Sequence, residues 1–283
     1  MTNPILELYG RSTASGDRPM WSRAIKSQIC PFTGNRCIKV RKSSPDISIG
    51  TCTVQYGKTP RPLVICPLRF LEKRQVFTDS LHLLQLHEPG NELHIVPEVS
   101  IPGGSIDYFL VSAHKGRVKD FAGIEIQTLD TTGTLWTARQ RFLGSVGLRV
   151  ADSDVRSSKK FGMNWKMTAK TILVQLHHKI ETFEHLGKHI VLATQDSLMH
   201  YMRQEFSFSG IRSVRTGDPL HFHSYSLDAG KSRLCLQLTE RTSTDSAGLS
   251  IALGLQAQAR VELDSILGLL ERKISDRTLW TPA

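Results

Sequence analysis

Two carboxylates and an amide carry the clearest chemistry in the sequence. Glu125 and Gln127 lie two positions apart in the stretch DFAGIEIQTLD, whose apolar and polar residues alternate. Such alternation predicts a β-strand with both side chains on one face. Asp107, in SIDYFLV, lies on a preceding predicted strand. If the two strands pair, Asp107 and Glu125 come close at one end of the sheet, where their repelling charges require a cation.

This arrangement is typical of phosphodiester hydrolysis. Mg²⁺ takes one or two carboxylates, completes its shell with water and phosphate oxygens, and lowers the pKa of a bound water. Asp107, Glu125 and Gln127 resemble the pattern of PD-(D/E)xK nucleases, with glutamine in the place of the final lysine. Glutamine can orient a water or a phosphate oxygen, but it supplies no positive charge. An exposed strand face fits the same residues, so the pattern alone leaves both interpretations open.

Cysteine spacing suggests a second, structural metal site. Four of the five cysteines crowd into 37 residues with the spacing C-x6-C-x14-C-x13-C: Cys30, Cys37, Cys52 and Cys66. Four thiolates form a closed tetrahedral site that accepts Zn²⁺ or iron and leaves no position for a catalytic water. Buried free cysteines are the alternative. Cys235, inside a strand pattern, is expected to be a small core residue.

The charge balance favours a polyanionic partner. The chain has 36 Lys and Arg against 26 Asp and Glu, a net charge of +10 and a pI near 9.5. Nucleic acid is such a partner, although a solvated basic surface has the same composition. Basic residues flank the cysteines and the start of a predicted helix, and we expect these to contact DNA: Arg36, Lys39, Arg41, Lys42, Lys159, Lys160 and Lys166. His221 and His223 share a strand face and are interpreted as surface or DNA-contacting residues.

The order of the predicted elements indicates an α/β fold with a mixed central sheet. The predicted helices span residues 67–88, 164–185 and 196–205, and a further helix begins near Asp264. The predicted strands span 92–97, 105–112, 119–129, 189–194 and 255–262, with two more in HFHSYSL and SRLCLQL. We expect an arm over residues 1–25, a four-cysteine metal-binding element over 26–70 and, from its PD-(D/E)xK-like residues, an endonuclease domain over 71–283.

The chain is expected to be cytoplasmic and free of membrane contacts. No run approaches the roughly 18 apolar residues of a membrane helix. The N-terminus lacks the basic and then apolar pattern of a signal peptide.

Longer motifs make the sequence similar to the NotI family of type II restriction endonucleases. The resemblance runs from about residue 28 to 272 and lies in CPFTGNRC, GTCTV, VICPLRFL, IDYFLV, GIEIQTLDTTGT, NWKMTAKTIL and ARVELDSILGLLERK. It implies a PD-(D/E)xK nuclease core with a central mixed sheet flanked by helices, plus a small N-terminal metal-binding element with four cysteine ligands. It also implies Mg²⁺-dependent cleavage of double-stranded DNA.

The same resemblance assigns roles to individual residues. Asp107 and Glu125 hold Mg²⁺, and Gln127 takes the place of the usual lysine. Glu98 matches an outlying carboxylate at a different distance from Asp107, and Lys170 matches a lysine of the family pattern. The four cysteines hold a single structural iron. Cutting both strands of a palindrome symmetrically implies a homodimer.

Two alternatives remain open at this stage. One is a repair or resolvase-type nuclease of the same fold. The other is a metal-stabilised DNA-binding protein without catalytic activity, which has no need of the Asp107, Glu125 and Gln127 set.

Overall fold

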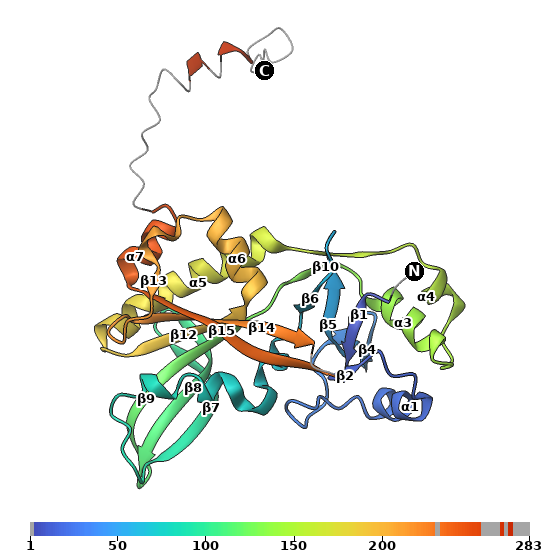
Figure 1. The fold of residues 1–283 in the computed structure, drawn as a ribbon, viewed down its shortest axis with the longest axis horizontal. Helices are drawn as coiled ribbons and strands as arrows, with labels where there is room; N and C mark the ends of the chain where they lie inside the picture. The colour runs from blue at the N-terminus through green and yellow to red at the C-terminus, as the bar shows by residue number, and fades with distance from the viewer. Residues whose placement is uncertain (1–2, 230–232, 256–266, 269–270, 274–283) are drawn as a thin grey trace, which may run out of the picture.

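The computed structural model describes residues 3–229, 233–255, 267–268 and 271–273 of the 283-residue chain (Figure 1). The strand predicted at 255–262 and the helix predicted from Asp264 lie almost wholly outside these residues. No helix in the described part is long and apolar enough to cross a membrane.

A seven-stranded mixed sheet forms the larger lobe of the molecule. Its strand order is β13-β15-β14-β12-β9-β8-β7, and β12 runs parallel to both β9 and β14 while the other pairs are antiparallel. The bounds are β7 Glu92–Ile101, β8 Gly104–His114, β9 Arg117–Gln127, β12 His189–Gln195, β13 Arg212–Ser213, β14 Leu220–Ala229 and β15 Leu234–Thr244. The predicted α/β class with a mixed central sheet is therefore confirmed.

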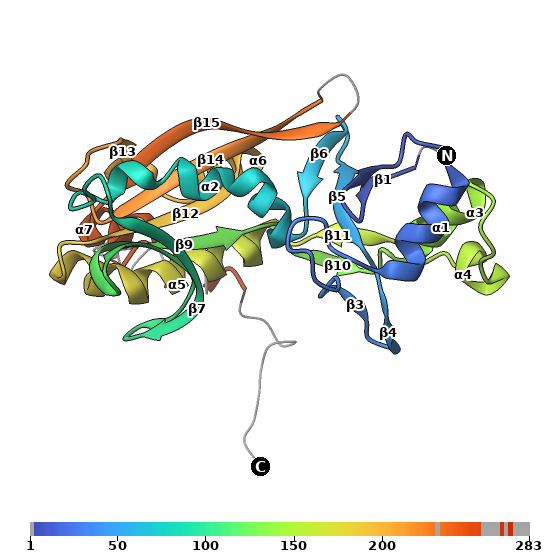
Figure 2. The same ribbon diagram turned by 90° about the horizontal axis from the view of Figure 1, so that it is seen from below.

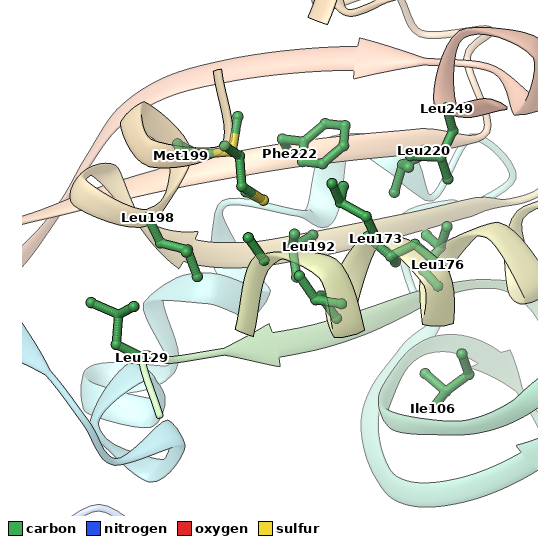
Figure 3. Close-up of a cluster of buried hydrophobic side chains, with 14 of the residues drawn as sticks. Ile106, Leu129, Leu173, Leu176, Leu192, Leu198, Met199, Leu220, Phe222 and Leu249 are labelled. Atoms are coloured by element: carbon green, nitrogen blue, oxygen red, sulfur yellow. The ribbon is translucent and has the colours of Figure 1, made fainter. Parts of the chain in front are cut away.

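Helices cover both faces of this sheet (Figure 2). One face packs against α5 (Trp165–His185), α6 (Asp196–Glu205) and α7 (Ser246–Ala252), and the opposite face against η1 (Pro67–Arg74), α2 (Gln75–Thr78) and η2 (Leu81–Leu83). Leu173 and Leu176 of α5 meet Leu192 of β12 in the hydrophobic core between the sheet and α5, α6 and α7 (Figure 3). Their spacing of three residues places both leucines on one face of the helix.

The smaller lobe holds the cysteines and is built on a four-stranded sheet of order β2-β1-β5-β6. Its elements are β1 Ile5–Leu8, β2 Arg11–Ser12, α1 Arg18–Ser27, β3 Val40–Arg41, β4 Ser44–Ser48, β5 Thr51–Tyr56, β6 Arg61–Val64, α3 Trp136–Ser145 and α4 Asp152–Arg156. Trp21 of α1 packs edge-on against Phe142 of α3, with ring centroids 5.0 Å apart. Strand β1 belongs to the expected N-terminal arm, yet it pairs with β5 inside this sheet. The expected domain boundaries themselves stay a prediction.

Residues 67–88 do not form the single helix that the sequence pattern predicted. The segment is broken into η1, α2 and η2, with left-handed backbone at Lys73 and Arg74. Arg69 explains much of the break, because its fully buried guanidinium lies 2.8 Å from Glu7 and 2.6 Å from Glu72. Satisfying a buried charge in this way takes precedence over continuing the helix.

His221 and His223 are not surface residues, which corrects their interpretation from the sequence. Both are fully buried on β14, and His82 of η2 stacks on His223 with ring centroids 6.0 Å apart. His221 donates from Nε2 to the Asp218 carbonyl, whereas both His223 ring nitrogens lack a partner in the described part of the chain. Burial lowers the pKa of His221 to about 4 and that of His223 to about 3, with Arg241 adding to the second shift.

Acidification is expected to destabilise the fold through these histidines. Between pH 6.5 and about 4 the unfolded state takes up their protons and the folded state does not, so stability falls with pH. Each of the two histidines lowers the free energy of unfolding by about 2 kcal/mol at pH 5, relative to its value above pH 6.5. The free energy of unfolding, measured in urea, falls between pH 7.5 and 5.0. We expect this fall to be about 2 kcal/mol smaller for His223→Gln than for wild type. His114→Gln, at an exposed position, is the control. Equal losses in all three proteins would contradict this account.

Cys235 also differs from its expected place. It lies on β15 opposite Asp228 of β14, and its side chain is exposed rather than part of the core. The neighbouring Leu236 takes the buried side of the strand. The strand itself was correctly predicted, but the side of the strand on which Cys235 lies was not.

Candidate active site

Three carboxylates lie in one row across adjacent strands of the larger sheet. Glu98 of β7, Asp107 of β8 and Glu125 of β9 take matching positions, as the flanking pairs show: Pro97–Tyr108, Val99–Ile106 and Tyr108–Ile124. Asp107 and Glu125, directly opposed on neighbouring strands, project from the same face of the sheet. Helix α5 covers that face. Phe109, two residues beyond Asp107 and on the same side of β8, lies in the hydrophobic core that packs against α5.

Asp107 and Glu125 interact closely. The Asp107 carboxylate accepts a hydrogen bond from the Ile126 backbone N–H at 2.8 Å. Burial raises the pKa of Glu125 to about 7, and the Asp107 charge adds to this shift. Burial likewise raises the pKa of Asp107. Two buried carboxylates that are hard to ionise together gain most from a bound cation, and their oxygens suit Mg²⁺.

Glu98 occupies the exposed end of the row. Its charge helps to raise the pKa of Asp107, so the two groups lie within electrostatic reach. Its backbone φ of +52° is in the left-handed region. Such a conformation costs a non-glycine residue on the order of 1 kcal/mol and re-aims its side chain.

Gln127 lies at the end of β9 and faces the same way as Glu125. The side chain is half-buried, and its Nε2 donates to the Thr128 carbonyl at 2.6 Å. The Gln127 carbonyl accepts a hydrogen bond from the Thr194 hydroxyl of β12 at 2.9 Å. The backbone is therefore fixed, and the amide oxygen can still accept from a water or another donor.

Lys179 of α5 is the site residue that the sequence interpretation missed. Its Nζ lies 2.6 Å from Glu125 Oε1 and 2.6 Å from the Ser105 carbonyl. A sequence signal existed, because Lys179 stands in the apolar stripe of α5, three residues after Leu176 and four before Phe183. A lysine at such a position must find a buried partner.

Lys170, the lysine favoured from the sequence, lies elsewhere on the same helix. It is exposed, as is Lys166. Nine residues separate Lys170 from Lys179, which is about 13 Å along the axis and half a turn around it. Lys170 thus projects from the opposite side of α5, and the structure does not bring it to the carboxylate row.

The four clustered cysteines are all buried in the smaller lobe. Cys30 and Cys37 flank a tight loop, in which the Cys30 N–H donates to the Asn35 carbonyl at 2.7 Å. Burial raises the pKa of Cys37, and the neighbouring thiols of Cys66 and Cys30 add to the shift. The Cys52 thiol donates to the Gly50 carbonyl at 3.5 Å and lies near the thiol of Cys66. The thiols therefore converge on one region.

The surroundings favour the thiolate at Cys66, whereas the pKa values of the Cys37 and Cys52 thiols are raised. Nearby backbone groups act to lower the pKa of the Cys37, Cys52 and Cys66 thiols. The neighbouring Cys52 thiol, together with the nearby Lys39 charge, lowers the pKa of Cys66 to about 6. Within the residues that the structure describes, no three His, Cys, Asp or Glu side chains are close enough to hold a metal as they lie. The donor chemistry fits a soft metal, and its binding stays a prediction.

The basic residues near the cysteines take different places. Lys39 points inward, donating from Nζ to the Ile65 carbonyl at 2.6 Å beside the thiols. Arg41 stacks over the Trp136 ring at 4.3 Å and lies 3.6 Å from Asp154. Arg36 and Lys42 are exposed. Of this group, Arg36 and Lys42 keep the accessibility that contact with a phosphate requires, whereas the Lys39 amine is directed away from solvent.

Lys159 and Lys160 line a groove of about 700 Å³ on the smaller lobe. Lys58 and Arg141, which the sequence interpretation did not single out, line it as well. The groove also holds aromatic side chains, and its Tyr56 and Phe161 rings lie 5.8 Å apart. Four positive charges beside aromatic rings form a suitable surface for a phosphate backbone.

Comparison with known families agrees with the geometry. The family described as restriction endonuclease NotI matches residues 20–212, which is more than half of the chain. The matched span includes the four clustered cysteines, the carboxylate row, Gln127 and Lys179. No curated protein matches the chain. The chain belongs to the NotI restriction endonuclease family.

Proposed function

We propose that this restriction endonuclease makes Mg²⁺-dependent double-strand cuts at a specific palindromic site, using a PD-(D/E)xK-type active site with glutamine in the lysine position. The observation that carries the proposal is the apposition of Asp107 and Glu125 on β8 and β9, with Gln127 two residues further along. A protein that only bound DNA would gain nothing from two carboxylates held in this repelling arrangement.

The residues of the site divide the work. Asp107 and Glu125 would hold Mg²⁺, which neutralises phosphate charge and acidifies water when bound. The N–H of Ile126 fixes the Asp107 carboxylate, so that its second oxygen is free to act as a ligand. Gln127 orients the attacking water through its amide oxygen. Glu98, at the exposed end of the row, adds a third acceptor near the same point.

The remaining parts of the protein serve DNA binding. The basic groove of Lys58, Arg141, Lys159 and Lys160 binds the phosphate backbone, in keeping with the net charge of +10. The four clustered cysteines hold one iron or zinc ion that stabilises the smaller lobe without taking part in the reaction. A homodimer presents two active sites to the two strands of a palindrome.

The test is digestion of a long DNA of known sequence in Mg²⁺, followed by sequencing of the fragment ends. We expect ends that share one palindromic sequence with symmetric cuts, and a dimer by light scattering. Ends without a common sequence would instead favour a repair or resolvase-type nuclease. Retention of DNA without any cleavage would favour a non-catalytic binding protein.

A further inference from the structure

A lysine reaches the catalytic carboxylates from an element other than the strand. The PD-(D/E)xK pattern places its lysine two residues after the glutamate, where this chain has Gln127. Lys179 Nζ instead approaches Glu125 to 2.6 Å from α5. The Lys179 charge also lowers the pKa of Asp107, so the ammonium lies within electrostatic reach of both carboxylates.

The position of this ammonium is built into the packing of the hairpin on the helix. Gly103, with a φ of +93°, lies at the tip between β7 and β8, and a Cβ there would stand 2.1 Å from the His178 carbonyl oxygen of α5. The Thr182 hydroxyl donates to the Pro102 carbonyl at 3.2 Å. This close approach of hairpin and helix puts the Ser105 carbonyl 2.6 Å from Lys179 Nζ.

Stability alone does not call for a lysine here. The Lys179 side chain is 7% exposed and that of Glu125 is 6% exposed, so the pair is nearly dehydrated. Replacing a buried ion pair by packed apolar residues is often neutral or stabilising. An apolar side chain between Leu176 and Phe183 would simply continue the α5 core. The Lys179 ammonium is therefore explained better by a role in the reaction at the carboxylates than by a role in stability.

We propose that Lys179 is a catalytic residue that provides, from α5, the positive charge that Gln127 cannot provide from the strand; the inference rests on the proposed nuclease function. An ammonium has three N–H donors, and Glu125 and Ser105 accept from two. The third remains for a non-bridging oxygen of the scissile phosphate. As the water oxygen bonds to phosphorus and the bond to the leaving oxygen breaks, negative charge grows on the non-bridging oxygens. The Lys179 ammonium stabilises this charge. Solvent takes the proton of the water and returns one to the leaving oxygen.

Charge removal at Lys179 tests this assignment. Lys179→Met removes the ammonium, whereas Lys179→Gln keeps a donor toward Glu125 and serves if methionine disturbs folding. In single-turnover cleavage with Mg²⁺, we expect each variant to lose about a hundredfold or more in rate. DNA affinity measured in Ca²⁺ should stay within about threefold of wild type. Lys119→Met, at an exposed position at the start of β9, is the matched control and should cleave like wild type.

Returning the lysine to the strand separates a catalytic role from a structural one. In the Lys179→Met background, Gln127→Lys should recover about tenfold or more of the lost rate, because the charge again faces the phosphate. A purely structural lysine would not be replaced from another element. Single variants within about threefold of wild type, loss of DNA affinity in step with cleavage, or no recovery by Gln127→Lys would overturn the assignment. Failure of wild type to cleave in Mg²⁺ would refute the nuclease function itself.

Discussion

Replacing Glu125 with glutamine is expected to lower the single-turnover rate of DNA cleavage on the order of a thousandfold while leaving DNA binding intact. Glu125 is the centre of the site, since it faces Asp107 and accepts from Lys179. Its pKa of about 7 means that the fold already tolerates a neutral group at this position. Glutamine keeps an oxygen for Lys179 but is a poor Mg²⁺ ligand. The measurement is quenched-flow cleavage in Mg²⁺ beside fluorescence anisotropy in Ca²⁺.

Glu184→Gln is the matched control for this substitution. Glu184 is an exposed glutamate on α5, so the change removes the same charge outside the carboxylate row. We expect its cleavage rate to equal that of wild type. Cleavage by Glu125→Gln at the control rate would remove the carboxylate row from the mechanism, and a matching loss of anisotropy signal would attribute the defect to binding.

Replacing Cys37 with serine is expected to release the proposed structural metal and unfold the smaller lobe. The Cys37 sulfur lies beside the thiols of Cys30 and Cys66 and is buried in the lobe. Because a structural metal contributes its binding free energy to folding, we expect a loss of more than about 3 kcal/mol in unfolding free energy. Elemental analysis should give one iron or zinc per chain for wild type and much less for the variant.

Cys235→Ser is the control, since Cys235 is exposed on β15. It should keep the metal content and melting temperature of wild type. An unchanged metal-to-protein ratio in Cys37→Ser, together with full solubility, would contradict a site made by the four clustered cysteines. Equal metal loss from both variants would indicate a general effect of thiol removal instead.

Much of the larger lobe was predictable because its patterns are local. The hairpin of β8 and β9, helix α5 and strand β12 follow from alternation and helical spacing within each segment. The break of residues 67–88 did not follow, because it depends on Arg69 meeting Glu7 from another lobe. Burial of His223 was missed for the same reason, since β14 is covered on that side by His82 of η2.

The candidate site divides in the same way. The proximity of Asp107 and Glu125 could be predicted from the sequence, because a short turn joins their strands and sets the register. Lys179 reaches this pair from a position 54 residues beyond Glu125 in the chain. The place of Lys179 in the buried stripe of α5, and the packing of Gly103 against that helix, bring this lysine rather than Lys170 to the site. The choice of Lys170 from the sequence followed a family pattern, whereas the structure selects the lysine in the buried stripe.

Plasmid digestion by wild type and Glu125→Gln, in Mg²⁺ and in excess EDTA, tests the central claim most directly. We predict discrete linear fragments from wild type in Mg²⁺ and intact plasmid in the other three reactions. Equal fragment patterns from both proteins, or cleavage that persists in EDTA, would contradict a Mg²⁺-dependent site centred on Glu125.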